Sequence, residues 1–438
     1  MNKLIAVAVL GVFIVISSCG QAPREISLER GDWPQYRADA GRAGYTPESL
    51  PSDLSLRWKR ETPPPSPAWR GVHTRMTFDY AAQPVVGCAT LYYGSSTDCT
   101  VYAVDAATGS ERWSFRTDAP VRFAPALWRD RVFAVSDDGY LYCLASKNGS
   151  LLWKKRGAPD DDMVLGNGHM VSLWPLRGGP VIRDDVLYVG AGIWPSDGIY
   201  IYALDPETGD ELWVNDDSGG MEYDQPHPGA RSKSGISSHG YLVAAGDNLF
   251  VPTGRSVPAA LDLETGALRY FHLQKFRTYG GSRVVATDDY LFAVSGNTRF
   301  EWETIGQRNA VFGSADGELL TSGELNSPAL AITPGHVLYI DSSDRHLKAL
   351  DRKSLLKETT VTNSKGETET RRILSEPSWT IDTHEPEAVT LIAAGDMIIS
   401  GTVNNKVTVM DAESKKVVWS ADVDGVPYGL AVAHGRLS

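Results

Sequence analysis

The sequence predicts an all-β fold, an eight-bladed β-propeller built of four-stranded antiparallel blades. A unit of apolar strands and turns containing Gly, Asn or Asp recurs along the chain, and helical periodicity is almost absent. A Trp recurs at the end of the fourth strand of the unit. One unit of roughly 40 residues cannot bury both of its faces alone, so several units must pack around a common axis.

Each unit contains three apolar strands, the third ending in Leu-Asp or Val-Asp, then a T-G or N-G turn and a Trp-bearing fourth strand. Well-preserved copies span residues 84–113, 125–153, 180–213, 241–270 and 390–419, and degraded copies span 283–320 and 328–379. A bulky ring at one fixed position is typical of packing between blades. The tryptophans that we assign to this role are Trp58, Trp113, Trp153, Trp213, Trp379 and Trp419, with Tyr270 in the same place once.

Both ends of the sequence contribute to the predicted eighth blade. Residues 54–61 resemble a fourth strand without its first three, and residues 429–438 resemble a first strand and the opening of a second. An N-terminal strand would thus close the last blade and remove free sheet edges. Because the third strand is missing, we expect a C-terminally incomplete blade: the sequence stops short of a natural end, the closing blade is defective, or the propeller is the front part of a longer polypeptide.

The amino terminus predicts an exported lipoprotein. Residues 1–18 contain one Lys and an apolar run from Leu4 to Ile16, too short for a membrane span and typical of a signal peptide. The sequence Ile16-Ser17-Ser18-Cys19 resembles the bacterial lipobox, which implies a lipid on Cys19, a tether over residues 19–31 and a propeller over 32–438. A plain secretory signal with a chance Cys is the alternative. Gly20 after the Cys favours the periplasmic face of the outer membrane over the inner membrane.

Composition excludes some functions. The chain has 42 Lys+Arg against 54 Asp+Glu, a net charge of −12, and no basic block, which argues against a nucleic-acid surface. The four cysteines have no C-x-x-C pair, so neither a zinc site nor a disulfide scaffold is indicated. The extended strand between Cys88 and Cys99 predicts no bridge between them, and Cys143 is predicted to be a buried core residue.

The segment LYYGSSTDCTVYAVDAATGSERW (residues 91–113) resembles the PQQ-like (pyrroloquinoline quinone) repeat. The opening GDWPQYRADAGRAGYT (31–46) resembles the lead-in of secreted propellers of that family. The family includes quinoprotein dehydrogenases and the propeller lipoprotein of the bacterial outer-membrane β-barrel assembly machinery. The adjacent cysteines and the calcium ligands of the dehydrogenases have no counterpart that we can align here. The resemblance therefore implies the assembly branch more than the enzyme branch.

In a propeller, the loops that join blades open onto the same face as the loops between second and third strands, and the long insertions fall in these two loop types. They span residues 61–81, 158–178, 217–239 and 297–309. Trp and Arg are typical of binding hot spots. The candidate binding residues on this loop face are Trp69, Arg70, His73, Arg75, His169, Trp174, Trp194, Gln225, His227, Arg255 and Trp302. The alternative is that these loops fold over one another as a small satellite core.

Catalytic and metal motifs are weak. Asp160, Asp161 and Asp162 favour a solvated acidic loop over a calcium site. The histidines at 73, 169, 227 and 239 lack ligand spacing, and Ser354 with Lys357 matches S-x-x-K by letters only. We therefore predict no catalytic residue, no metal and no cofactor. An insertion at residues 357–378 predicts a protruding hairpin on the outer rim.

These observations predict a lipid-anchored, extracytoplasmic binding or scaffold module for a protein or cell-envelope polymer, either a monomer or part of a larger assembly. The alternative is a quinoprotein-type enzyme that holds PQQ and calcium, with Arg75 or Arg255 on the quinone carboxylates. Convergent Arg, His and carboxylate groups under a Trp at the channel mouth would favour the enzyme, and a mouth without them would favour the scaffold.

Overall fold

The computed structural model describes most of the chain from Leu28 onward. The described residues are 28–29, 31–69, 77–166, 168–224, 229–254, 256–276, 279–294, 298–300, 303–305, 309–362, 366, 368–385 and 387–438. The predicted signal peptide and Cys19 lie outside them. Within them, no helix is both long enough and apolar enough to cross a membrane.

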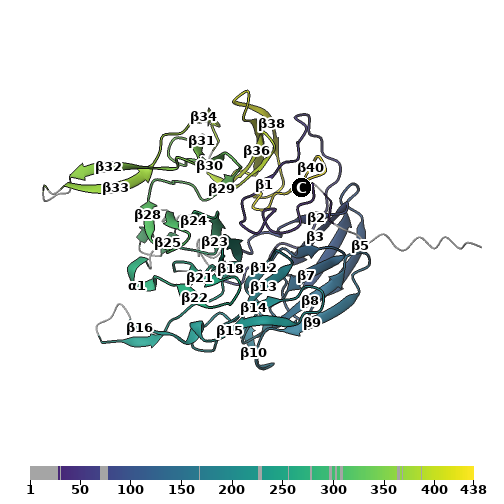
Figure 1. Cartoon of the computed structure of the whole chain (residues 1–438). Coiled ribbons are helices and arrows are strands. Elements are labelled where there is room, and N and C mark those ends of the chain that lie inside the picture. The colour runs from purple at the N-terminus through teal and green to yellow at the C-terminus, as the bar shows by residue number, and fades with distance from the viewer. Residues whose placement is uncertain are drawn as a thin grey trace, which may run out of the picture.

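Seven antiparallel sheets follow one another in chain order around a common centre, and each is a four-stranded meander (Figure 1). Sheets 1 to 3 contain β2 (Val85–Gly87), β3 (Thr90–Ser95), β4 (Thr100–Asp105), β5 (Glu111–Arg116); β6 (Ala126–Trp128), β7 (Arg131–Val135), β8 (Tyr140–Ala145), β9 (Leu151–Arg156); and β12 (Gly178–Arg183), β13 (Val186–Ala191), β14 (Tyr200–Leu204), β15 (Glu211–Asn215). The predicted all-β propeller class is confirmed.

Sheets 4 to 7 continue the same meander. They contain β19 (Val243–Ala245), β20 (Asn248–Val251), β21 (Ala259–Asp262), β22 (Leu268–Tyr270); β23 (Arg283–Ala286), β24 (Tyr290–Val294), β27 (Ala310–Gly313), β28 (Leu319–Ser322); β29 (Leu330–Ile332), β30 (His336–Ile340), β31 (His346–Asp351), β34 (Trp379–Asp382); and β35 (Ala388–Ala394), β36 (Met397–Thr402), β37 (Lys406–Asp411), β38 (Lys416–Asp422). No complete eighth sheet is present among the described residues, so the eight-blade count stays a prediction.

Short elements decorate the sheets. β1 (Tyr45–Thr46) and β18 (Gly240–Tyr241) pair in parallel with β35 and β12 at the inner edges of sheets 7 and 3. The remaining elements are the hairpins β10 (Met163–Gly166) with β11 (His169–Ser172), β16 (Glu222–Asp224) with β17 (Arg231–Lys233), β25 (Thr298–Phe300) with β26 (Glu303–Ile305), β32 (Leu356–Thr362) with β33 (Thr368–Leu374) and β39 (Val432–Ala433) with β40 (Arg436–Leu437), and the helical turns η1 (Ser218–Gly220) and α1 (Leu273–Phe276). The predicted rim hairpin is β32–β33, which projects from the ring (Figure 1).

The Asp that ends the third strand holds the turn into the fourth strand. Asp105 Oδ1 accepts hydrogen bonds from the N–H groups of Ala107 at 3.0 Å and Thr108 at 2.9 Å. The hydrogen bond from Arg112, together with these turn donors, lowers the pKa of Asp105 to about 2. Asp262 repeats the arrangement with Glu264 and Thr265. The Asp of the Leu-Asp or Val-Asp signature therefore stabilises the turn, since a side-chain acceptor at this position satisfies the N–H groups of the tight turn.

The Gly of the same turn packs against the fourth-strand Trp of the preceding sheet. Trp113 of sheet 1 donates from Nε1 to the Ser146 carbonyl of sheet 2 at 2.8 Å. A Cβ added at Gly149 would lie 2.6 Å from the Trp113 ring, and Gly149 also has a φ of +70°. The turn therefore needs Gly for both its backbone conformation and its contact with the ring. Equivalent donations run from Trp153 to Glu207, from Trp213 to Leu263 and from Tyr270 to Ser314.

Trp379 makes a different contact. Its ring lies 5.7 Å from the His336 ring of its own sheet. It also packs against the core cluster that joins sheets 6 and 7. Trp379 therefore contributes to the packing between two blades without the carbonyl contact that the other fourth-strand rings make.

An N-terminal segment, residues 33–46, runs inside the ring and bonds to every sheet in turn; we call it the inner segment (Figure 1). Trp33 exchanges two 2.8 Å backbone hydrogen bonds with Val86 of sheet 1. Inner-segment oxygens then accept hydrogen bonds from one first-strand N–H of each later sheet. The pairs of donor and acceptor residue are Leu127 and Pro34, Ile182 and the Gln35 side chain, Ala244 and Ala40, Ala286 and Gly41, Ile332 and Ala43, and Ala393 and Gly44.

Arg42 fixes the inner segment at the centre of the ring. Its fully buried guanidinium donates to the carbonyls of Leu242 at 2.9 Å, Pro180 at 2.8 Å and Tyr36 at 3.0 Å. Burial lowers the pKa of Arg42 to about 10. The rings of Tyr36 and Tyr241 each lie 5.8 Å from its charge. Because these carbonyls belong to sheet 3, sheet 4 and the inner segment, one side chain ties three parts of the chain together.

Both ends of the described chain fill the space between sheets 7 and 1. Trp419 of sheet 7 donates to the Leu54 carbonyl at 3.0 Å, and Trp58 donates to the Ala106 carbonyl of sheet 1 at 3.1 Å. Residues 54–58 thus stand where another fourth strand would stand, although they form no assigned strand. The hairpin β39–β40 shares one core cluster with Trp58 and Trp33. The closure is made by the two segments that the sequence analysis assigned to it.

We predict that Trp58→Ala lowers the free energy of unfolding by about 3 kcal/mol, because it removes a packed ring and a carbonyl contact from the closure. Equilibrium denaturation measures this loss. Trp194→Ala is the matched control, because Trp194 is 50 % exposed and its loss should cost less than about 1 kcal/mol. Equal losses in the two variants would contradict the proposed closure.

Candidate functional site

Chain direction places the elaborated loops and the inner segment at opposite ends of the central channel. The inner segment bonds at or near the C-terminal ends of the first strands. Loops that connect neighbouring sheets enter at the N-terminal ends of those strands, together with the loops between second and third strands. The hairpins β10–β11, β16–β17 and β25–β26 all lie in these loops, so the loop face is the elaborated end of the ring.

The structure brings together three of the predicted loop-face residues. The rings of Trp69 and Trp194 meet edge to face at 5.9 Å, and the ring of His239 lies 5.9 Å from Trp69. Trp174 donates from Nε1 to the Asp197 carbonyl at 2.6 Å, which joins its loop to the loop that carries Trp194. Three separate loops therefore contribute Trp69, Trp194 and His239 to one aromatic cluster.

The other candidate residues are not part of that cluster. His169 lies in β11, opposite Gly166. The remaining candidate residues lie outside the part of the chain that the structure describes, and they are Arg70, His73, Arg75, Gln225, His227, Arg255 and Trp302.

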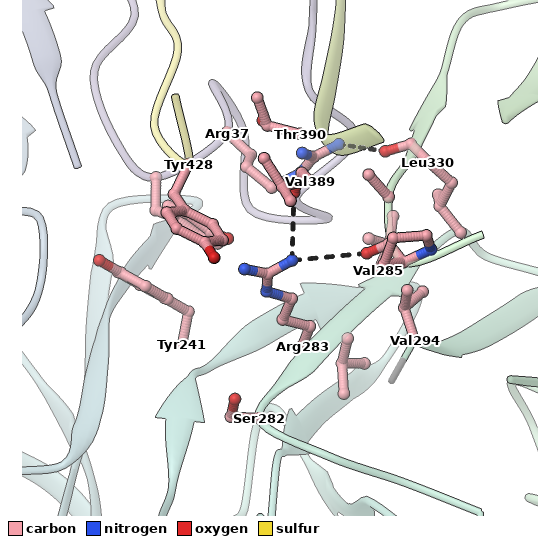
Figure 2. A pocket seen from close by; sticks show the side chains of 14 residues that line it. Arg37, Tyr241, Ser282, Arg283, Val285, Val294, Leu330, Val389, Thr390 and Tyr428 are labelled. Carbon is pink, nitrogen blue, oxygen red and sulfur yellow. Dashed lines mark hydrogen bonds between the residues drawn. The ribbon is translucent and has the colours of Figure 1, made fainter. Parts of the chain in front are cut away.

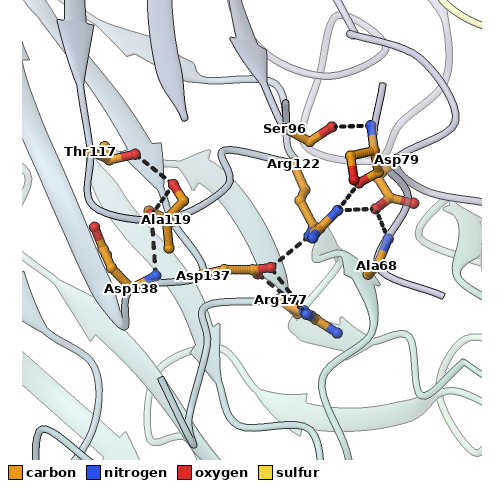
Figure 3. A network of polar contacts seen from close by, with 11 residues as sticks. Ala68, Asp79, Ser96, Thr117, Ala119, Arg122, Asp137, Asp138 and Arg177 are labelled. Carbon is orange, nitrogen blue, oxygen red and sulfur yellow. Dashed lines mark hydrogen bonds and ion pairs between the residues drawn. The ribbon is translucent and has the colours of Figure 1, made fainter. Parts of the chain in front are cut away.

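A buried ionic network joins two arginines and two aspartates next to Ala68 (Figure 3). Arg122 contacts Asp79 at 2.8 Å and Asp137 at 2.6 Å, and Arg177 holds both oxygens of Asp137 at 3.0 and 3.1 Å. All four side chains are almost completely buried. The Arg177 guanidinium lies 5.8 Å from the Trp69 ring. The carboxylates and guanidinium groups at the channel mouth are therefore directed mainly at one another.

Burial and ion pairing act in opposite directions on the two carboxyl groups. Burial raises the pKa of Asp79, and the charge of Arg122 only partly offsets it. Burial also opposes ionisation of Asp137, but Arg177 and Arg122 together outweigh it and hold the pKa of Asp137 below its ordinary value. Asp137 is thus a fixed anion at the centre of the network.

The network positions the loops above it. Asp79 accepts from the Ala68 N–H at 2.7 Å, which fixes the backbone next to Trp69. The Ser172 N–H, at the end of β11, donates to the Asp137 carbonyl at 2.8 Å, and the Leu173 N–H donates to the Asp162 carbonyl at 2.8 Å. The base of the β10–β11 hairpin is therefore held on the same network as the aromatic cluster.

The sequence analysis missed this network, although the sequence carries a signal for it. Arg122 and Arg177 each stand three residues before the proline that opens a repeat unit, Pro125 and Pro180. A charged residue at the same entry point of two successive blades faces the channel in both. Asp79 carries no comparable signal, because its partner Arg122 is 43 positions away in the sequence.

Metal ligands do not converge in the part of the chain that the structure describes. No group of three or more His, Cys, Asp or Glu side chains there could hold an ion. Asp160, Asp161 and Asp162 are exposed on the loop before β10. Cys88 and Cys99 are not bonded to each other, and Cys143 is fully buried in the core.

We predict that Arg122→Met lowers the free energy of unfolding by about 3 to 5 kcal/mol, because it leaves Asp79 and part of Asp137 buried without a counter-charge. Arg112→Met is the control, since Arg112 pairs with Asp105 at the surface and should cost less than about 1 kcal/mol. Denaturant titration of the two variants measures both values. A similar small loss in both would contradict a structural role for the network.

Part of the chain is similar in sequence to two curated quinone-dependent dehydrogenases. The chain is 26% identical over 138 residues to a 1-butanol dehydrogenase (quinone) of Thauera butanivorans, covering 28% of this chain and 20% of the relative. It is 26% identical over 149 residues to a quinoprotein ethanol dehydrogenase of Pseudomonas aeruginosa, covering 30% and 22%. The matched segment thus spans about a fifth of the length of these curated relatives.

A solved structure supports the fold over nearly the whole chain. The quinohemoprotein alcohol dehydrogenase ADHIIG of Pseudomonas putida HK5 superposes with a TM-score of 0.58 at 13% identity. The superposition covers 93% of this chain and 75% of that one. At this identity, the likeness concerns the fold alone.

These relatives correct one expectation from the sequence. We expected no cofactor, because the adjacent cysteines and calcium ligands of quinoprotein dehydrogenases have no counterpart here. The two curated relatives are quinone-dependent by name, and they overturn that expectation. The expectation rested on the absence of these two motifs. A propeller can hold a ligand with other residues as well, so their absence does not exclude a cofactor.

The family model described as outer membrane protein assembly factor BamB matches residues 56–172 and 171–354, about two thirds of the chain. The matched residues run from the closing segment near Trp58 through sheets 1 to 5 and into sheet 6. The match therefore covers the whole series of repeats rather than a single motif. The chain therefore belongs to the PQQ_2 family of PQQ-like repeat propellers, the family of the assembly factor BamB.

Proposed function

We propose that this protein is a binding module that recognises a protein partner in an envelope assembly through its loop face. The observation that carries the proposal is the exposed apolar surface of the β10–β11 hairpin. Leu165 is 76 % exposed and Met170 is 53 % exposed, and Met163 and Val164 are exposed beside them. Exposed apolar side chains grouped on one element are typical of interaction sites.

The hairpin is suited to binding because its base is rigid and its edges are free. Its base bonds to the buried network through the Ser172 N–H, which donates to the Asp137 carbonyl. Within the described residues, β10 and β11 form a sheet of only two strands, so each has an open edge for a partner strand. Asp160, Asp161 and Asp162 beside it favour a partner whose apolar surface has basic neighbours.

The family supplies the partner class. An assembly factor of the outer membrane works on other proteins of that membrane, so the partner that we propose is the β-barrel assembly complex of the same cell envelope. A lipid on Cys19 and a position on the periplasmic face of the outer membrane belong to this proposal.

We predict that Leu165→Asp weakens co-purification of the full chain with the β-barrel assembly complex by at least about tenfold, because a charge replaces apolar contact area. Leu212→Asp is the matched control, because Leu212 is 55 % exposed on β15, away from the loop face. Quantitative pull-down from detergent-solubilised envelopes measures both. Binding that is unchanged in Leu165→Asp, or lost equally in both variants, would contradict the proposal.

A second candidate function is quinone binding at the channel mouth. Two observations favour it: the curated relatives are named as quinone enzymes, and Arg122, Arg177, Asp79 and Asp137 converge under Trp69 with His239 near its ring. The described residues do not fit a calcium ion, because the carboxylates are already bound to arginines and no set of three ligands converges. We therefore derive no reaction step for this candidate.

Titration with pyrroloquinoline quinone, with and without calcium, tests the second candidate through the melting temperature of the soluble body (residues 32–438). A ligand at about 100 times its Kd stabilises by about 2.7 kcal/mol, which is a rise of a few degrees. A calcium-dependent rise would support quinone binding. No rise at millimolar quinone would remove this candidate and leave the partner-binding proposal unaffected.

A further inference from the structure

A small cavity with about 30 Å³ of accessible space lies in the central channel between the inner segment and sheets 5 to 7 (Figure 2). Tyr36 and Arg37 of the inner segment line it on one side. Arg283, the first residue of β23, projects into it among Tyr241, Tyr428 and Val389 (Figure 2). It is separate from the ionic network of the channel mouth, which shares none of its residues with this lining.

The charge of Arg283 is only partly satisfied. Its Nη1 donates to the carbonyls of Val389 at 3.2 Å and Pro328 at 3.4 Å, both long contacts. Its Nε and Nη2 make no hydrogen bond to the described residues, and no described carboxylate forms an ion pair with it. By contrast, Arg122 and Arg177 at the mouth each hold a carboxylate. Arg283 is therefore a channel cation with open donors.

A second cation stands beside it. Arg37 donates to the Arg42 carbonyl at 2.9 Å and to the Leu330 carbonyl, and no described carboxylate pairs with it. Burial lowers the pKa of Arg37, and the nearby charge of Arg283 lowers it further. Two guanidinium groups that repel each other across a cavity create a field that an anion would relieve.

Ser282 adds an unused hydroxyl. It is 2 % exposed, it lines the cavity, and its Oγ has no hydrogen-bond partner. A buried polar atom without a partner costs free energy unless something bonds to it. Ser282 directly precedes Arg283, and both residues line the cavity (Figure 2).

We propose that this cavity is a binding site for a small oxyanion, a molecule that carries a carboxylate or phosphate group held by Arg283 with Ser282 as a second donor. A guanidinium presents parallel N–H groups that match two oxygens of such a group. The accessible space is small, so the group that it takes is a compact anion or a single carboxylate. The site is independent of the loop face and of the quinone candidate.

Calorimetric titration of the purified full chain with inorganic phosphate, and separately with succinate, at fixed ionic strength tests the proposal. We expect a Kd no weaker than about 10 mM for one of them, and a loss of at least about tenfold in Arg283→Gln, since hydrogen bonds to a charged group contribute about 1.5 to 3 kcal/mol. Binding of phosphate alone identifies a phosphate ligand, and binding of succinate alone identifies a carboxylate ligand.

Two further variants make the test specific. Arg352→Gln is the matched control, because Arg352 also donates to a backbone carbonyl, that of Thr333, but lies outside the cavity. Ser282→Ala should weaken binding less than Arg283→Gln. If Arg283→Gln does not fold, Arg283→Lys can replace it. Lysine keeps the positive charge but lacks the parallel N–H groups of the guanidinium, so binding should still weaken several-fold. Absence of binding for both probes at about 50 mM, or equal binding in the Arg283 and Arg352 variants, would overturn the proposal.

Discussion

The structure depends on one continuous interaction, the chain of hydrogen bonds from the inner segment to the first strand of every sheet. Seven sheets that touch only their neighbours could shift relative to one another, because the contact that recurs between them is one side chain on a turn carbonyl. One backbone segment forms hydrogen bonds with Val86, Ala244, Ala286 and Ala393 in turn. It therefore fixes the positions of their strands along the channel axis relative to one another. Arg42 strengthens this arrangement, because its guanidinium donates hydrogen bonds to the carbonyls of Leu242 and Pro180 and to the segment itself.

This arrangement determines where ligands and partners can act. The inner segment closes one end of the channel, and the network of Arg122 and Asp137 closes the other beneath Trp69. The cavity around Arg283 lies beside the inner segment, against sheets 5 to 7. The loop face lies outside the mouth, where the β10–β11 hairpin is held at its base and exposed at its tip. Small ligands and protein partners would thus meet different parts of the same rigid ring.

The repeat could be predicted from the sequence because its signals are local. The Asp of the third strand and the Gly of the turn act within a few residues of each other, and the Trp of the fourth strand acts on the next copy of the same turn. The sequence positions of Arg122 and Arg177 hint at the network, but the partners within the network and the contacts of the inner segment could not be predicted, because they are far apart: Arg42 meets Leu242 at a separation of 200 positions. A single sequence carries propensity and period, but it does not show which distant residues share the channel.

Native-state hydrogen exchange tests the central role of the inner segment most directly. The account predicts that the N–H groups of Ala244, Ala286, Ile332 and Ala393, all of which donate to inner-segment oxygens, exchange only through global unfolding and with the same free energy of opening. The donors then belong to one cooperative unit that spans the ring. Exchange of these amides through separate local openings, with different and much lower free energies for the individual sheets, would contradict the account.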